Sequence, residues 1–406
     1  MKVIERKYLL PFVLVTSLFA LWGLANNMTD TLLAAFRKIM QMSDTQTSFI
    51  QMAFYGAYFC LALPAALFIR KHSYKSGVIL GLCLYALGAI LFLPAASAAS
   101  YAFYLIAIYI MAAGCSVLET TANPYIMSMG SPETATRRLN IAQSFNPIGS
   151  IMGILVSKYF ILQDISLYSV SGTYAAVGGV LIAIMIVMLF VRMPEGSDGS
   201  GVQDFKGTSV AASFRRLLKN RNYAFGVVAQ FFYVGAQICI WSFTIRLVMK
   251  ELGVIESQAA TIYLISIIGF CASRFVYTWL MKYVAPQQLL AIGALLSTIC
   301  VLLVVLTSGW FCVVSLILVS VFMSLMFPTI YGIALGSVSE SEHFDDTKIG
   351  ASGLIMAILG GALLTPVQGI VSDYSNINMS YLVPMGCFLV VLAYALRVGP
   401  KRNTRV

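Results

Sequence analysis

Long stretches without a charged side chain are the feature that most constrains how this chain can fold. A helix needs about 20 apolar residues to cross a bilayer. Eight uncharged stretches fit one crossing each, and two longer ones fit two each, with breaks expected near 95–100 and 308–309. The pattern predicts an all-α integral membrane protein with twelve transmembrane helices. The ten stretches are 8–29, 45–69, 76–118, 139–157, 165–191, 222–245, 257–273, 283–339, 349–372 and 374–396.

The charge distribution supports this interpretation and predicts the topology. Only 10% of the residues are charged, whereas soluble domains carry about 25%. If the N-terminus is cytoplasmic, 20 of the 26 basic residues lie on the cytoplasmic side, five lie opposite, and Arg274 lies within a helix. Basic residues concentrate in cytoplasmic loops. This four-to-one bias indicates that both termini are cytoplasmic. The topology also explains the net charge of +10, so no nucleic-acid partner is expected.

A polar segment at 194–221 divides the chain. It begins with a flexible, glycine- and serine-rich composition and ends in a basic sequence at 215–221. We expect an N-terminal six-helix half at 1–193, a cytoplasmic linker at 194–221 and a C-terminal six-helix half at 222–406. The basic end is expected to form an amphipathic helix, which either contacts lipid headgroups or only fixes the topology. Two six-helix halves with a central linker are the architecture of the major facilitator superfamily, whose substrates bind near the bilayer midplane.

Two carboxylates lie within the apolar sequence. Asp30 directly follows the stretch 8–29, and Glu119 interrupts the fourth expected helix. A charge at bilayer depth costs about 2.5–3.5 kcal/mol on insertion scales, so such a residue is a functional candidate by default. A protonated acid in a dry cavity donates a hydrogen bond to a hydroxyl group and loses this ability when it ionises. We expect Asp30 and Glu119 to couple proton movement to a polar solute, unless Asp30 pairs with Arg37 or Lys38 or Glu119 is structural.

Amide and aromatic side chains in the helices are candidates for contact with that solute. Amides both donate and accept without charge, which suits sugar hydroxyls, and aromatic rings pack against apolar C–H faces. Each residue also has a structural interpretation: amides bond between helices, aromatic rings pack, and an arginine pairs within the bundle. Gln143 and Asn146 are three residues apart and are expected on one helix face. The candidates are Asn27, Gln143, Asn146, Tyr233, Gln237, Trp241 and Arg274.

Other function classes lack the residues that they need. The eight cysteines lie in apolar segments without CxxC spacing, and the two histidines, His72 and His343, lie in expected loops. No HExxH or GxSxG motif is present, so we expect no enzyme, no catalytic residue and no metal site. A transporter-like sensor usually carries an added soluble domain, and here only 194–221 and the short terminal segments could form one. The many amides argue against a proton-driven effluxer of apolar cations.

Five motifs resemble the fucose–galactose–glucose:proton symporter family of the major facilitator superfamily, and within it most closely the L-fucose:proton symporters. The resemblance covers essentially the whole chain. The motifs are ANNMTDTLL at 25–33, FIQMAFYGAY at 49–58, LETTANP at 118–124, RLNIAQSFN at 138–146 and AQFFYVGAQ at 229–237.

The resemblance implies a role for several candidates. Asp30 and Glu119 match the two intramembrane acids of the family implicated in proton coupling, and Asn27, Gln143 and Asn146 match polar residues near the sugar. It implies a sugar:proton symporter of the bacterial inner membrane, with L-fucose as the leading substrate and galactose, glucose or an amino sugar as alternatives. The proton gradient replaces any cofactor. The expected partners are the sugar, the proton and membrane lipid, and the chain is expected to be a monomer.

Overall fold

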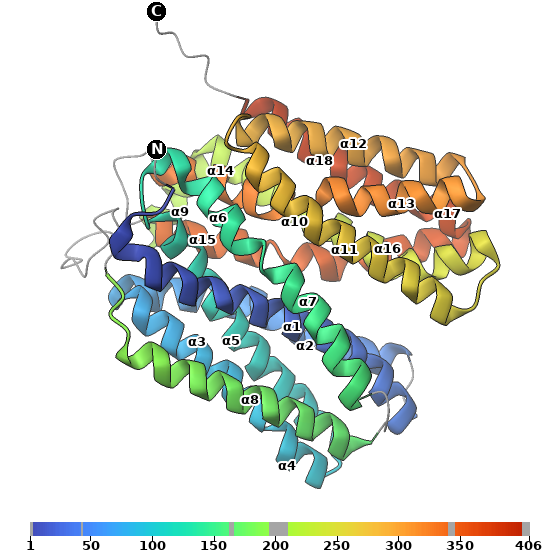
Figure 1. Cartoon of the computed structure of the whole chain (residues 1–406), viewed down its shortest axis with the longest axis horizontal. Coiled ribbons are helices and arrows are strands. Elements are labelled where there is room, and N and C mark those ends of the chain that lie inside the picture. Colours follow the sequence, from blue (N-terminus) through green and yellow to red (C-terminus); the bar gives the residue numbers. More distant parts are fainter. Residues whose placement is uncertain (1–2, 42–43, 162–165, 195–209, 340–345, 400–406) are drawn as a thin grey trace, which may run out of the picture. The chain divides into compact units, whose positions relative to one another are not determined.

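Helices alone form the part of the chain that the structure describes. The structure is a computed structural model, and it describes residues 3–41, 44–161, 166–194, 210–339 and 346–399 (Figure 1). Within these ranges, 12 helical segments are long and apolar enough to cross a membrane. The predicted all-α membrane fold is therefore confirmed. The breaks expected near 95–100 and 308–309 are also confirmed, because one helix ends and the next begins at each.

The helices follow one another along the chain. They are η1 (Arg6–Tyr8), α1 (Leu9–Ile39), α2 (Asp44–Lys71), α3 (Tyr74–Ile90), α4 (Phe92–Ser97), α5 (Tyr101–Met127), η2 (Pro132–Thr134), α6 (Ala135–Gln143), α7 (Asn146–Val156), η3 (Ser157–Ile161), α8 (Leu167–Phe190), α9 (Val210–Lys219), α10 (Arg221–Leu252), α11 (Glu256–Leu280), α12 (Pro286–Leu306), α13 (Gly309–Met323), α14 (Met326–Ser339), α15 (Asp346–Met356), α16 (Leu359–Tyr374), α17 (Ile377–Ser380) and α18 (Leu382–Arg397).

The chain forms two compact units that differ from the expected halves at two segments. The first unit comprises Met1–Ala135, Phe145–Phe214 and Ser341–Met356, and the second comprises Thr136–Ser144, Arg215–Glu340 and Ala357–Val406. Almost all of α6 therefore belongs to the second unit, and α15 belongs to the first. The division of the sequence at 194–221 stays a prediction.

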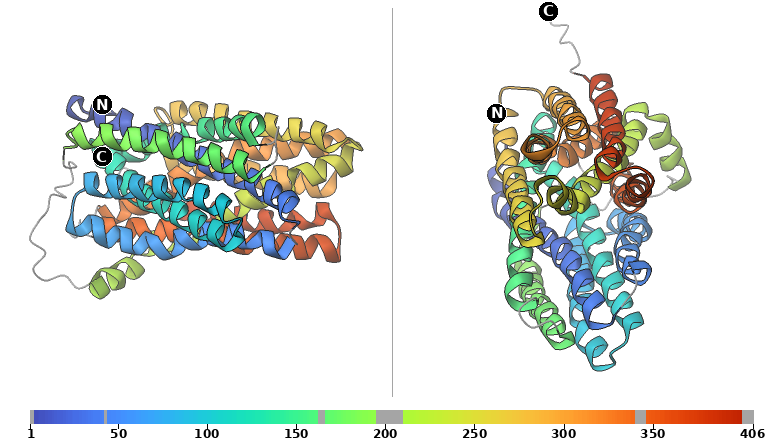
Figure 2. Two further views of the ribbon diagram at one scale, coloured as in Figure 1. Left: turned by 90° about the horizontal axis from the view of Figure 1, so that it is seen from below. Right: turned by 90° about the vertical axis from the view of Figure 1, so that its right-hand side faces the viewer.

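The first unit is organised around α5. This helix packs against α2 and α3, α3 also packs against α8, and α15 packs against α2 and α5. The helices of the unit run along roughly one direction (Figure 2). From Met111 to Met127 every residue of α5 is buried, and a helix that is buried on all sides belongs to the core of a bundle.

Glycines set the close approach of α1 to α7 in the same unit. A Cβ atom on Gly149 would lie 1.7 Å from the carbonyl oxygen of Ala20, and one on Gly23 would lie 2.0 Å from that of Asn146. Only a residue without a side chain lets two helix backbones come this close, which is a common device of membrane helix packing. The α1–α7 pair is therefore locked in register, because any other residue at these positions meets the main chain.

The second unit is organised around α10. This helix of 32 residues packs against α11, α13, α14, α16 and α18. A second group of neighbours forms where α12 packs against α13 and α18, and these three helices lie side by side in Figure 1. Asn220 caps the first turn of α10 by accepting hydrogen bonds from the N–H groups of Asn222 and Tyr223, both at 3.1 Å. At the other end Gly253 has a φ of 64° and ends the helix in the left-handed conformation that favours glycine.

The close contact of α1 with α7 predicts the effect of one added methyl group. We expect Gly149→Ala to destabilise the protein by about 1–3 kcal/mol, because the new Cβ would overlap the main chain of α1. Thermal unfolding of the purified protein in detergent measures the effect. The control is Gly172→Ala in α8, where a Cβ would meet no atom within 4 Å. Equal unfolding temperatures for the two variants would contradict the packing of α1 on α7.

Candidate functional site

The packing of α1 against α7 brings together two of the predicted sugar-contact residues, Asn27 and Asn146. The side-chain amide of Asn146 donates to the carbonyl oxygen of Phe19 at 3.2 Å, and that of Asn27 donates to the carbonyl oxygen of Gly23 at 3.2 Å. Both side chains are half-buried. The glycines that bring α1 and α7 together therefore also fix the two amides on one pair of helices.

Glu119 lies in the part of α5 that is buried on all sides. Its side chain is buried, and in the described part of the chain no lysine, arginine or histidine lies within ion-pair distance of it. The groups within electrostatic range are the Tyr58 hydroxyl and the Cys115 thiol. Among the described residues, the surroundings of Glu119 thus supply polar atoms and no ion-pair partner for the carboxyl group.

Asp30 lies inside α1, which continues to Ile39. The helix is therefore longer than the uncharged stretch 8–29, and Asp30 is an interior residue of it. The side chains of Asp30, Arg37 and Lys38 lie outside the described residues. Proton coupling through Asp30 and pairing of Asp30 with Arg37 or Lys38 both stay predictions.

Gln143 and Asn146 do not share one continuous helix, so this expectation was wrong. α6 ends at Gln143, α7 begins at Asn146, and the units divide at the same point. The cause is Pro147, which has no N–H group to donate to the carbonyl oxygen of Gln143 four residues earlier. The break leaves that buried carbonyl without its helical partner.

The Arg274 guanidinium donates to this carbonyl. Its Nη1 atom lies 2.8 Å from the carbonyl oxygen of Gln143, and its Nε atom lies 2.7 Å from that of Ser324. Ser324 stands four residues before Pro328, so a second proline has freed the second carbonyl. One guanidinium therefore satisfies both carbonyls at helix breaks, and its planar fork of donors suits this geometry.

The rest of the Arg274 environment is equally specific. The side chain is 3% exposed and lies over the ring of Phe270, with 4.7 Å between the guanidinium carbon and the ring centroid. Arg274 was predicted either to pair within the bundle or to contact the sugar. Its hydrogen bonds go to main-chain carbonyls at the end of α6 and between α13 and α14, which favours the first interpretation.

Tyr233, Gln237 and Trp241 lie along α10 and differ in the hydrogen bonds that they make within the protein. The hydroxyl of Tyr233, which is fully buried, donates to the carbonyl oxygen of Met323 at 3.1 Å. The indole N–H of Trp241 donates to Ser320 Oγ at 3.3 Å, and both Gln237 and Trp241 are half-buried. Gln237 makes no hydrogen bond within the described residues, unlike Tyr233 and Trp241.

The predicted residues thus fall into two groups. Asn27, Glu119 and Asn146 belong to the first unit, and Gln143, Tyr233, Gln237, Trp241 and Arg274 belong to the second. Sequence reasoning missed the carbonyl oxygen of Ser324 as a partner of Arg274. The available signal was Pro328, because a proline inside a helix frees the carbonyl four residues earlier.

The two prolines predict a thermodynamic coupling with Arg274. We expect Arg274→Met to lower the unfolding temperature, because a buried carbonyl without a donor costs about 1–3 kcal/mol. Pro147→Ala supplies an N–H group for the Gln143 carbonyl, so the double variant should recover part of the loss. Thermal unfolding of the two single variants and the double variant measures the coupling. Strictly additive losses would contradict this role of Arg274.

Comparison with known sequences identifies relatives along the whole chain. The L-fucose-proton symporter of Haemophilus influenzae is 40% identical and covers 98% of both chains. That of Escherichia coli is 36% identical and covers 96% of this chain and 93% of its own. A glucose/galactose transporter of Brucella abortus is 30% identical and covers 98% of this chain and 96% of its own. The resemblance carried by the five motifs is confirmed.

Solved structures agree with the sequence comparison. The crystal structure of FucP, a major facilitator superfamily transporter in the outward conformation, matches with a TM-score of 0.88 at 35% identity, over 98% of this chain and 100% of that one. The proton:xylose symporter XylE matches with a TM-score of 0.73 at 11% identity over 96% of each chain, which shows the same fold. The family model described as Major Facilitator Superfamily matches residues 13–344. The chain therefore belongs to the major facilitator superfamily of membrane transporters.

Proposed function

We propose that this transporter imports a sugar together with a proton by alternating access, and that the sugar is L-fucose. The observation that carries the proposal is the similarity, over 98% of both chains, to an L-fucose-proton symporter. The glucose/galactose transporters, at 30% identity, make another hexose the alternative. A proton-driven effluxer is disfavoured because amides accompany the two acids in the candidate set.

Asp30 and Glu119 carry the proton in this proposal. Asp30 takes up the proton from outside, and Glu119 links its own protonation to sugar binding. The burial of Glu119 without an ion-pair partner in the described chain supports this role, since a permanent salt bridge would hold the carboxylate in one state. One proton moving down 100 mV releases about 2.3 kcal/mol, which supports more than tenfold accumulation at about 1.4 kcal/mol per factor of ten.

Amide and aromatic groups contact the sugar. Asn27 and Asn146 offer amides on α1 and α7, and Gln143 offers one at the end of α6. Gln237 and Trp241 present an amide and an indole ring on α10, four residues apart and therefore on one helix face. Tyr233 and Arg274 support this site through their bonds to the main chain.

The same proposal places the protein in the bacterial inner membrane with both termini in the cytoplasm, where the basic residues concentrate. It works as a monomer and needs no cofactor besides the proton gradient. The basic residues of α9, Arg215, Arg216 and Lys219, contact lipid headgroups. No nucleic acid takes part.

The proton role predicts the behaviour of two isosteric variants. Asp30→Asn and Glu119→Gln should each abolish accumulation of L-fucose against its gradient, because an amide cannot take up and release a proton. Uptake of radiolabelled L-fucose into proteoliposomes under an imposed pH gradient measures this. If both variants still concentrate the sugar, the assigned proton roles are wrong.

Substrate identity is tested in the same proteoliposomes by competition. Unlabelled L-fucose should suppress uptake of the label more strongly than galactose or glucose. If galactose or glucose competes better, the L-fucose assignment fails while sugar import stands. If no sugar competes, the proposed function itself is wrong.

Gln237 provides a test of the contact on α10. Gln237→Ala should raise KM for the sugar about twofold to tenfold, since a hydrogen bond contributes about 0.5–1.5 kcal/mol. The matched control is Ser242→Ala, a polar residue on the exposed side of the same helix. An unchanged KM in Gln237→Ala would remove Gln237 from the site.

A further inference from the structure

A buried carboxylate, Glu251, lies at the C-terminal end of α10, ten residues after Trp241. The side chain of Glu251 is only 6% exposed, whereas that of the adjacent Lys250 is 50% exposed. A carboxylate is costly to bury unless it is paired and hydrogen-bonded. The surroundings of Glu251 should therefore explain why the charge is there.

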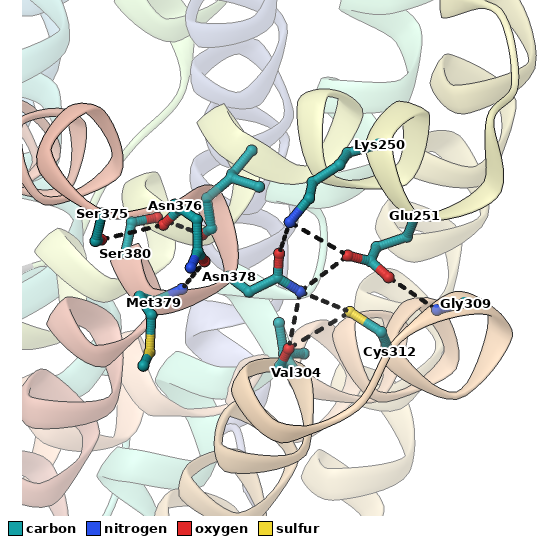
Figure 3. A network of polar contacts seen from close by, with 11 residues as sticks. Lys250, Glu251, Val304, Gly309, Cys312, Ser375, Asn376, Asn378, Met379 and Ser380 are labelled. Carbon is teal, nitrogen blue, oxygen red and sulfur yellow. Dashed lines mark hydrogen bonds and ion pairs between the residues drawn. The ribbon is translucent and has the colours of Figure 1, made fainter.

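Both carboxylate oxygens of Glu251 are bonded (Figure 3). Oε2 accepts from the backbone N–H of Gly309 at 2.8 Å, and Oε1 accepts from Asn378 Nδ2 at 3.0 Å. Lys250 Nζ lies 3.7 Å from Oε1 and donates to Asn378 Oδ1 at 2.5 Å. These four residues, Lys250, Glu251, Gly309 and Asn378, form what we call the Glu251 clamp.

The dipoles of the helices explain the direction of the clamp. A carboxylate at the C-terminal end of its own helix is unfavourable, but one at the N-terminus of another helix is favourable. Gly309 is the first residue of α13, and the preceding Ser308 makes no capping bond with its side chain. Glu251 therefore supplies an acceptor to the first turn of α13, where the side chain of Ser308 supplies none.

The clamp joins segments that are far apart in the sequence. Glu251 ends α10, Gly309 begins α13, and Asn378 lies in α17. Asn378 also donates to the carbonyl oxygen of Val304 near the end of α12, at 3.4 Å. Four helical segments of the second unit thus meet at one buried charge.

The clamp is also the last of a series of bonds that connect α10 and its N-cap to two consecutive helices, α13 and α14. These bonds run along the length of α10, and each goes to a residue of α13 or α14. Trp241 is itself one of the tie points, and Gln237 lies between it and Tyr233. The pairs are Asn220–Ser337, Tyr233–Met323, Trp241–Ser320 and Glu251–Gly309.

We propose that Glu251 is a positioning residue for the sugar-binding face of α10: the clamp fixes the end of the helix, and this sets the place of Gln237 and Trp241. Trp241 is ten residues from Glu251, or about 15 Å along the helix, so the clamp acts through the helix and never touches sugar. The part that concerns sugar rests on the proposed function. The clamp itself is independent of it.

Cys312 reports whether the clamp is closed. This thiol is fully buried, with its sulfur 4.0 Å from Asn378 Nδ2 and 3.6 Å from the carbonyl oxygen of Val304. Reaction of purified protein with N-ethylmaleimide, followed by mass spectrometry of the peptide containing Cys312, gives the rate at which this region opens. Cys115, buried in the first unit, is the internal control.

Three variants test the clamp by this rate. Glu251→Gln leaves one side-chain oxygen for two donors, the Gly309 N–H and Asn378 Nδ2, and Asn378→Asp replaces the donor to Glu251 by a second carboxylate. Each variant therefore loses a bond of the clamp and should speed the labelling of Cys312 at least about tenfold without changing that of Cys115. The double variant restores a donor and an acceptor with exchanged roles, so its labelling should return towards the wild-type rate. The matched control is Asp373→Asn, which removes an exposed carboxylate from α16 and should change nothing. Unchanged labelling in the single variants, or additive effects in the double variant, would overturn the clamp.

Transport kinetics test the positioning role. Glu251→Gln should raise KM for L-fucose about threefold to tenfold with a nearly unchanged maximal rate per folded molecule, and the double variant should restore KM. A KM that stays at the wild-type value while Cys312 becomes reactive would overturn positioning and leave a purely structural clamp. If the wild-type protein does not transport L-fucose, the proposed function fails, and the Cys312 rates still decide the clamp.

Discussion

The bilayer interior offers no water to the backbone, and the rest of this structure follows from that constraint. Every N–H and C=O group in the hydrocarbon region needs a partner within the protein, so the spanning segments are helices. Where a proline interrupts a helix, the carbonyl oxygen four residues earlier loses its helical donor and needs another one. Pro147 and Pro328 free the carbonyls of Gln143 and Ser324, and the guanidinium of Arg274 donates to both. A buried positive charge is thus a consequence of two broken helices.

A second consequence is that close packing takes over from the hydrophobic effect between helices, because lipid is as apolar as the side chains. Gly23 and Gly149 let the backbones of α1 and α7 touch, and this contact places Asn27 and Asn146. At the end of α10, Glu251 connects helix ends by charge-assisted hydrogen bonds. Close backbone contact at glycines and hydrogen bonds to a buried carboxylate both fix the position of one helix along its neighbour, which hydrophobic contact alone does not.

The number of helices and their approximate limits could be predicted because each span leaves a long uncharged stretch in the sequence. The breaks after α4 and α12 could be predicted because short polar residues mark them. The break between Gln143 and Asn146 was missed, although Pro147 marks it, because both amides were assigned to one face of an unbroken helix. The structure assigns most of α6 to the second unit and α15 to the first, against their order in the sequence. No local sequence pattern predicts this, since it depends on which helices each short segment packs against.

The sequence alone determined the class of protein, its family and the identity of the candidate residues, because hydrophobicity and charge are properties of residues and the motifs are local. Only the tertiary structure decided which candidates are bound by the protein itself. It joined Arg274 to two carbonyls, Tyr233 to a third and Trp241 to Ser320, and it left Gln237 without a bond among the described residues. A hydrogen bond needs two atoms within about 3 Å, and segments as distant in sequence as α6 and α11 meet at that range only after folding.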